Sequence, residues 1–150
     1  NGGELGFKFE TQFQRWSIDG LMKVGLGGMY QEANIWGRTT VTPPGSAPDV
    51  REGDLYALPS NIGTYSRNKF AVVPEVRLNL NYCITPSWRV NVGYTFMYWS
   101  EVVRAASLVN PELNVTQLLP PVIGPAVPTF TFVNGDLWAQ GLNFGTELRF

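Results

Sequence analysis

The segment DLWAQGLNFGTELRF, Asp136 to Phe150, alternates between two kinds of side chain. Side chains of a β-strand point in turn to opposite faces, so the even positions share one face and the odd positions the other. The even face is mostly large and apolar: Trp138, Gln140, Leu142, Phe144, Thr146, Leu148 and Phe150. The odd face is small, amide-bearing or charged, and it ends with Glu147 and Arg149. The segment therefore predicts a strand with one apolar and one polar face.

The same alternation recurs in four further segments, whereas helical periodicity is hard to find. We expect strands at Leu5–Trp16, from Leu21 onward, at Lys69–Ile84 and from Trp88 onward. Tight turns are predicted at Ser17–Gly20, which contains Asp-Gly, and at Thr85–Ser87. Thr42–Asn68 and Arg104–Gly135 are rich in turn-forming residues and are predicted to be long loops, and nothing in Thr42–Asn68 looks helical. Within the third strand, Pro74 predicts a bulge or a local break in pairing.

The composition of the 150 residues excludes several classes of function. The chain has no His and one Cys, so it lacks the commonest general base and metal ligand and cannot form an intrachain disulfide. Its formal net charge of −1 gives no basic excess for nucleic acid. We therefore expect a protein that is not an enzyme, with no catalytic, metal or cofactor site and no nucleic-acid partner. No apolar run is long enough for a spanning helix, so a membrane role would require a β-barrel.

Short and long connections alternate along the chain, which places both tight turns at one end of the strands and both long loops at the other. This asymmetry is typical of bacterial outer-membrane barrels. We predict an all-β fold, a transmembrane antiparallel β-barrel with about five strands in this chain, short periplasmic turns and long extracellular loops. A soluble β-sandwich or a small soluble barrel is the alternative, in which the apolar faces would form a core.

Aromatic residues occur toward both ends of the predicted strands, as in the interface girdles of membrane barrels. Tyr82, Trp88 and Phe150 fall at the short-turn end, and Tyr30, Tyr98 and Trp138 fall at the long-loop end. A packed soluble core does not usually present Trp and Tyr at both ends. The aromatic pattern therefore favours the membrane barrel.

Charged residues occur on the polar faces, which would line the lumen of such a barrel. They are Lys8, Glu10, Lys23, Glu75, Arg77, Arg89, Glu147 and Arg149. In one interpretation these charges set the field of a pore and hence its ion preference. In the other they pair with one another in salt-bridge ladders across the strands. Both interpretations can hold at once.

Cys83 is expected to be a small lumen or interface residue.

Three motifs carry a resemblance to a known family. LYALPSNIGTYSRNKFAVVPEVRLNLNY (Leu55–Tyr82), VNVGYTFMYWSEVVR (Val90–Arg104) and LWAQGLNFGTELRF (Leu137–Phe150) closely resemble the C-terminal part of planctomycete proteins in the seventh family of beta-barrel porins. Members of that family are considerably longer. The resemblance therefore implies that residues 1–150 are the C-terminal portion of a single outer-membrane β-barrel domain of a Gram-negative cell envelope.

Single-chain bacterial barrels close with an even number of strands, so five strands are expected to form an incomplete barrel. Further strands before Asn1, or other copies of the chain, would supply the rest. The expected function is a porin-like passive pore for small polar solutes in the bacterial outer membrane. The alternative is a structural or adhesive envelope barrel with a plugged lumen that displays large external loops. An outer-membrane enzyme and a soluble ligand-binding barrel rank lower.

The expected partners are outer-membrane lipid and the barrel assembly machinery. The last strand resembles the signal by which that machinery recognises its substrates. The matching positions are Leu142, Phe144, Leu148 and Phe150. Phe150 is then expected to sit in the aromatic girdle at the short-turn end.

Overall fold

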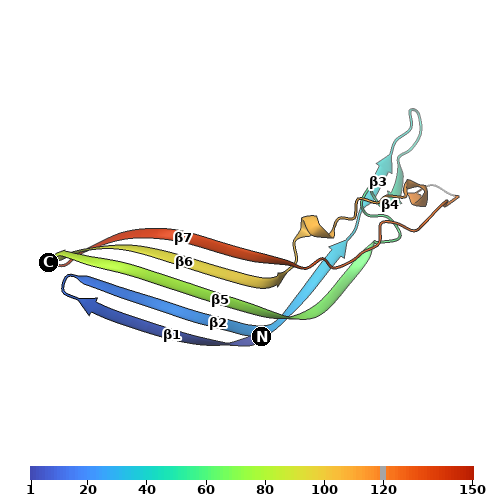
Figure 1. Ribbon diagram of the computed structural model, residues 1–150. Helices are drawn as coiled ribbons and strands as arrows, with labels where there is room; N and C mark the ends of the chain where they lie inside the picture. Colours follow the sequence, from blue (N-terminus) through green and yellow to red (C-terminus); the bar gives the residue numbers. More distant parts are fainter. Residues whose placement is uncertain (119–120) are drawn as a thin grey trace. The chain divides into compact units, whose positions relative to one another are not determined.

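The computed structural model describes residues 1–118 and 121–150, and within these residues the fold is all-β (Figure 1). The strands are β1 (Gly2–Phe13), β2 (Trp16–Ile35), β3 (Arg38–Val41), β4 (Asp49–Glu52), β5 (Gly63–Thr85), β6 (Trp88–Val102) and β7 (Gly135–Leu148). Two short 3₁₀ helices, η1 (Ala105–Leu108) and η2 (Val115–Leu118), follow β6. None of the helices in the described part of the chain is long and apolar enough to cross a membrane. The predicted all-β class is confirmed.

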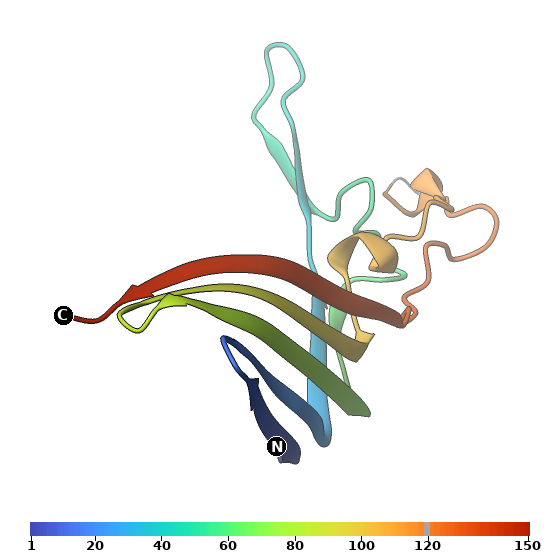
Figure 2. The same ribbon diagram turned by 60° about the vertical axis from the view of Figure 1, so that its left-hand side comes forward.

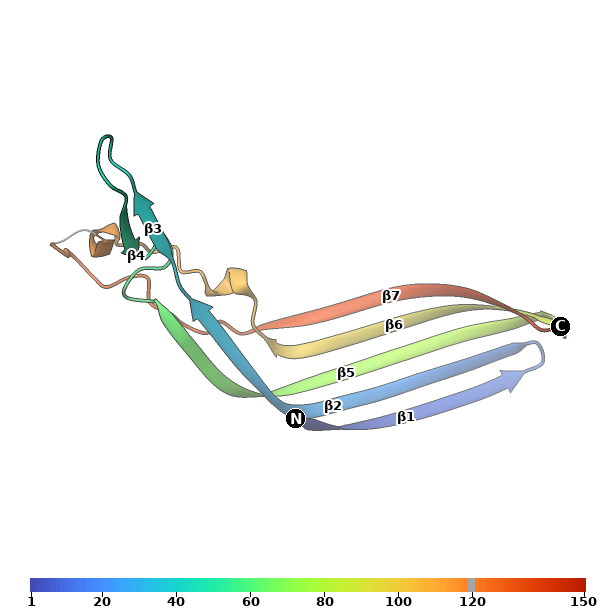
Figure 3. The same ribbon diagram turned by 180° about the vertical axis from the view of Figure 1, so that it is seen from behind.

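Five strands form one sheet in the order β1-β2-β5-β6-β7 (Figure 1). The pairs β1–β2, β5–β6 and β6–β7 are antiparallel. The sheet is open, with β1 and β7 at its two edges. Figure 3 shows that both tight turns lie at the end of the sheet where the C-terminus lies. The predicted succession of strands, short turns and long connections is therefore confirmed, and these five strands do not close a barrel by themselves.

The chain forms two compact units. The first, here called the sheet unit, comprises Asn1–Met29, Lys69–Val102 and Gly135–Phe150. The second, here called the loop unit, comprises Tyr30–Asn68 and Val103–Asn134. Strands β2 and β5 contribute residues to both units. The sheet unit is a single curved layer of strands (Figure 2), and Ala71 is the one buried apolar side chain that its described residues contain.

The first tight turn lies before the predicted position. Phe13 pairs with Trp16 in the β1–β2 ladder, so Gln14 and Arg15 form the turn. Gln14 adopts a φ of 51°, as the two-residue turns of β-hairpins require. The predicted turn at Ser17–Gly20 is wrong, because these residues belong to β2. The second turn, Pro86 and Ser87, lies within the predicted Thr85–Ser87.

The Asp-Gly pair is used inside the sheet instead of in a turn. The carboxylate of Asp19 accepts hydrogen bonds from the side-chain amides of Asn79 and Asn81, at 2.7 and 2.8 Å. The ring of Phe9, the cross-strand partner of Gly20, lies over that glycine in the space that a methyl group would occupy. An aromatic ring that covers a strand glycine is a known stabilising arrangement in sheets. Asp19 therefore binds side chains of β5, and Gly20 makes room for a ring of β1.

Replacement of this glycine is expected to have a measurable cost. In Gly20→Ala the new methyl group overlaps the Phe9 ring and lies 3.0 Å from Leu78 Cδ2, so both side chains must shift. We expect a loss of about 1 kcal/mol in the free energy of unfolding, at the low end of the cost of overpacking. Urea unfolding of the full-length protein in lipid vesicles measures it. Gly3→Ala, on the same face with no atom of the described residues within 4 Å of the added methyl, is the control; an equal loss there contradicts the explanation.

Several strand boundaries differ from the sequence-based expectations. β1 runs from Gly2 to Phe13, whereas Leu5–Trp16 was expected, and β5 begins at Gly63, ahead of the expected Lys69. β5 continues through Pro74, and its ladder with β6 begins at the next residue, where Glu75 pairs with Met97. Because proline cannot donate a ladder hydrogen bond, this position agrees with the predicted local break in pairing.

The C-terminal strand ends before the last two residues. β7 stops at Leu148, and the backbone N–H of Arg149 donates a hydrogen bond to the carbonyl of Ser87 in the second turn, at 2.9 Å. The side chain of Phe150 is fully exposed. The expectation that the strand extends to Phe150 is therefore wrong, because the partner strand β6 begins at Trp88, opposite Leu148.

The long connections are not plain loops. β3 and β4 form an antiparallel hairpin, in which Arg38 pairs with Glu52, and β4 lies inside the segment expected to be a loop. Leu58 and Pro128 are fully buried in the loop unit. Ser60 joins the two connections: its N–H donates to Gln117 Oε1 at 3.1 Å, and its hydroxyl donates to the carbonyl of Pro128 at 2.8 Å. Residues 42–68 and 103–134 thus share a small core.

Candidate functional site

The register of the sheet places the polar side chains on one face, here called the polar face. It contains the even-numbered residues of β1 and the odd-numbered residues of β2, β5, β6 and β7. Cys83, Arg89 and Glu147, for example, lie opposite one another on three adjacent strands. Seven of the eight charged residues that the sequence singles out lie in strands on this face, and Arg149 follows β7 directly. The alternation therefore assigned these residues to the correct face of the sheet.

One ion-pair cluster joins β1, β2 and β5. Lys23 Nζ lies 3.0 Å from Glu75 Oε2 and 3.5 Å from Glu4 Oε2. Arg77 Nη2 donates to Glu75 Oε1 at 3.2 Å. The Glu75 side chain is only 16% exposed, so it is the most enclosed member and receives both cations. The cluster neutralises its own charges and ties three strands together, as the salt-bridge interpretation expects.

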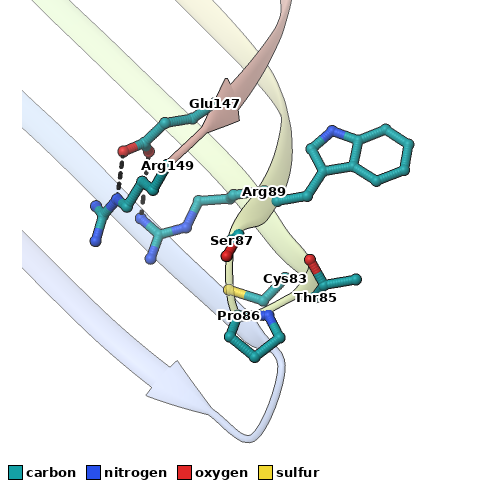
Figure 4. Close-up of a pocket in the computed structure, with 8 residues that line it drawn as sticks. Cys83, Thr85, Pro86, Ser87, Arg89, Glu147 and Arg149 are labelled. Carbon is teal, nitrogen blue, oxygen red and sulfur yellow. Dashed lines mark hydrogen bonds and ion pairs between the residues drawn. The ribbon is translucent and has the colours of Figure 1, made fainter.

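A second cluster lies beside the tight turn between β5 and β6 (Figure 4). Arg149 Nε donates to Glu147 Oε1 at 2.8 Å, and Arg89 Nη1 lies 4.0 Å from Glu147 Oε2. Figure 4 shows the two arginine side chains converging on this carboxylate. With Cys83 and the turn residues they line a small pocket; its members are Cys83, Thr85, Pro86, Ser87, Trp88, Arg89, Glu147 and Arg149. Cys83 is half-buried on the polar face.

The two remaining predicted residues lie near Asp19. Lys8 lies close enough to Asp19 to attract its carboxylate electrostatically, and Glu10 is the cross-strand partner of Asp19. The structure thus brings six of the eight predicted residues into two ion-pair clusters and places the other two around a carboxylate that the sequence analysis did not select. The candidate site therefore includes Asp19 in addition to the eight predicted charged residues.

Between the ion-pair clusters lies a row of amides, here called the amide band, which sequence reasoning missed. It consists of the amides of Asn79, Asn81, Asn91 and Asn143 and of the Asp19 carboxylate that Asn79 and Asn81 bind. Asn79 and Asn143 flank Gly93 in register, and Asn91 lies between Asn81 and Gly145. The signal was present in the short motifs LNLNY, VNV and LNF, whose asparagines all have the same parity in their strands. These asparagines carry no charge, so a pattern of charged residues does not reveal them.

The opposite face of the sheet, here called the apolar face, is exposed over most of its area. Large apolar side chains on every strand are exposed, including Leu5, Phe7, Met22, Leu26, Leu78, Val92, Leu142 and Phe144. Phe144 is 78% exposed although it lies in mid-strand. A β-sandwich would bury such side chains beneath a second sheet. Among the described residues, the sheet unit contains one layer, and no second sheet covers these side chains.

The aromatic residues at the short-turn end form contacts that the sequence did not reveal. Trp16, which was not selected from the sequence, packs against Tyr82 with ring centroids 4.5 Å apart. Trp88 Nε1 donates to Thr146 Oγ1 at 2.8 Å. Phe150 lies outside β7 and is fully exposed. Trp16, Tyr82 and Trp88 thus lie at this end of the sheet, and the rings of Trp16 and Tyr82 are in contact.

At the long-loop end, Tyr98 and Trp138 lie opposite each other on β6 and β7. Tyr30 belongs to the loop unit, where its hydroxyl donates to Glu32 Oε2 at 2.9 Å. Two of the three residues expected at this end are thus brought together within the sheet unit.

An open antiparallel sheet with one apolar and one polar face is the wall architecture of β-barrel proteins. A family model described as Putative beta barrel porin-7 matches residues 1–150, and the chain belongs to that family. The family expected from the motifs is confirmed. A search of curated proteins found no match, and a search of solved structures found none. The described residues contain no group of three or more His, Cys, Asp or Glu side chains arranged to hold a metal ion.

Proposed function

We propose that the chain forms part of an outer-membrane β-barrel that acts as a passive pore for small polar solutes. The two-faced sheet is the observation that carries this proposal. Apolar side chains are exposed on one face, while ion pairs and amides occupy the other. In an outer-membrane barrel, the first face contacts lipid and the second lines an aqueous lumen. Membership of the porin family supports the same assignment.

The spacing of aromatic residues on β6 fits the thickness of a membrane. Trp88 and Tyr98 share a face and are ten residues apart. At about 3.3 Å per residue, they are separated by about 33 Å along the strand. A strand tilted by about 40° then spans a height of about 25 Å, the height of the apolar band in outer-membrane barrels. Val90, Val92, Tyr94 and Phe96 lie between them on the same face.

The open edges of the sheet require further strands in a membrane. Backbone groups at the edges of β1 and β7 would otherwise be unpaired in hydrocarbon, which costs several kcal/mol for each group. In our proposal, strands from the same polypeptide or from another copy complete the barrel. An even total number of strands is expected for a barrel made from one polypeptide.

One observation favours a second candidate function, an envelope barrel that displays its external segments. The two long connections form a compact unit with its own buried residues, Leu58 and Pro128, instead of extended loops. An ordered unit of this kind could bind a partner at the cell surface or obstruct a lumen. The two functions differ in whether the folded barrel conducts.

Reconstitution of the full-length protein into planar bilayers tests the proposal. We expect stepwise conductance in KCl, because a polar face that lines an open lumen admits hydrated ions. Heat-modifiable electrophoretic mobility establishes that the reconstituted barrel is folded, and heat-denatured protein is the control. A folded barrel that does not conduct would contradict the pore and favour the display function. Protein that folds only as a soluble species would contradict both.

A further inference from the structure

The charges of the polar face are balanced. Its acids in the sheet unit are Glu4, Glu10, Asp19, Glu75 and Glu147, and its bases are Lys8, Lys23, Arg77, Arg89 and Arg149. Lys69 and Glu101, 4.0 Å apart, add one charge of each sign. Rings of charged side chains give a pore ion selectivity when one sign of charge is in excess along the wall. This part of the wall has no such excess, so it supplies no electrostatic reason to prefer cations or anions.

The amide band is held in a defined arrangement from one side. Asn79 Nδ2 donates to one carboxylate oxygen of Asp19 and Asn81 Nδ2 donates to the other, while Asn81 Nδ2 also lies 3.3 Å from the carbonyl of Ser17. Each of these donors is committed to the carboxylate, so the orientation of each amide plane is set. The nearby Lys8 attracts the Asp19 carboxylate and offsets its charge. The band therefore presents oriented amides, which carry no charge, around the single carboxylate of Asp19.

Two glycines create the room that the amides occupy. A methyl group on Gly93 would overlap the side-chain amides of both Asn79 and Asn143, because they lie over the α-carbon of this glycine from the two flanking strands. A methyl group on Gly145 would lie 2.7 Å from Asn91 Oδ1. The amides thus lie across the glycines, and their positions depend on the absence of side chains there.

We propose that the amide band is a binding site for uncharged, hydroxyl-bearing solutes such as sugars. A hydroxyl group both donates and accepts hydrogen bonds. The amide and carboxylate groups of the band place hydrogen-bond donors and acceptors close together, so both can bind one hydroxyl. Because these groups are already oriented, they lose little conformational entropy when a solute binds. This lower cost favours selective binding of a solute, even if the affinity is weak. The inference rests on the proposed pore, and it specifies the class of solute that the pore carries.

Gly93→Ala is the sharpest test, because it displaces the amides without removing them. The overlap involves the ends of two side chains and not the backbone, so the sheet can accommodate the methyl group. Gly141→Ala is the matched control: Gly141 lies on the same face, on the strand of Asn143, and no atom in the described part of the chain lies within 4 Å of the added methyl. Both proteins are the full-length chain, checked for folding by heat-modifiable mobility.

The measurement is the reduction of the KCl current through single pores as glucose is added. In wild type and Gly141→Ala we expect glucose to reduce the current with the same half-maximal concentration. In Gly93→Ala that concentration is expected to rise by about tenfold, the effect of losing one good hydrogen bond, with the KCl conductance nearly unchanged. Asn143→Ala, which removes one amide, is expected to raise it as well.

Three results would overturn the inference. Glucose that leaves the wild-type current unchanged, in a pore that conducts KCl, would exclude sugar binding and leave the proposed pore intact. The same half-maximal concentration in wild type, Gly93→Ala and Asn143→Ala would place any sugar site outside the amide band. A folded wild-type barrel without KCl conductance would contradict the proposed function itself and the inference with it.

Discussion

An arginine in place of Val92 is expected to lower the free energy of unfolding of the full-length protein in lipid vesicles by about 2–4 kcal/mol. Val92 lies in mid-strand on the apolar face, between Leu80 and Phe144. At the middle of a bilayer a guanidinium loses its hydration, and this loss is the source of the cost. Urea unfolding, followed by tryptophan fluorescence in vesicles, measures the change.

Met97→Arg is the matched control, because Met97 lies on the same strand with its side chain on the polar face, opposite Glu75. An arginine there meets water and a carboxylate, so a change within about 0.5 kcal/mol is expected. Val92 is already 36% exposed in the sheet. In water its replacement would therefore also cost little, and equal effects of the two substitutions in vesicles would contradict contact of the apolar face with lipid.

Truncation of Leu58 to alanine is expected to destabilise the loop unit by about 2–5 kcal/mol. Leu58 is 0% exposed, and its N–H donates to the side chain of Asn61 at 2.8 Å. Because this hydrogen bond holds the backbone in place, the truncation leaves a cavity where the side chain was. Hydrogen exchange of the reconstituted protein measures the effect. The exchange of amides in Tyr30–Asn68 and Val103–Asn134 should accelerate, because local opening exposes them.

Leu55→Ala is the control for this truncation, since Leu55 lies three residues away and is 47% exposed. Its effect is expected to stay below about 0.5 kcal/mol. Unchanged exchange in Leu58→Ala would contradict an ordered core in the long connections. Such a result would also remove the observation that favours the display function.

Period-two alternation predicted the five long strands and the face of the seven selected charged residues that lie in them. It could do so because the alternation is a property of each strand by itself. The Asp-Gly pair at Asp19–Gly20 misled the turn assignment, since the local preference for a turn was outweighed by the Asn79 and Asn81 amides and by the Phe9 ring. These contacts come from other strands, and no local rule contains them.

The hairpin of β3 and β4 was missed for a related reason. Each of its strands has four residues, and only Val41 and Val50 supply large apolar side chains, so the alternation is too short to recognise. The amide band was visible only as asparagines of common parity. Asp19 contacts Asn79 and Asn81 because β2 and β5 are neighbours in the sheet. The sequence does not show which strands are neighbours, so it could not predict this contact.

The residues alone determined the all-β class, the two faces of the sheet and the family, because side-chain alternation and local motifs are written in consecutive positions. Only the tertiary structure decided which charges pair, where the amides converge and how the long connections fold. Ser60, for example, bonds to Gln117 and Pro128, which lie 57 and 68 positions further along the chain. Contacts over such separations leave no periodicity, so they follow from the packing of the folded chain.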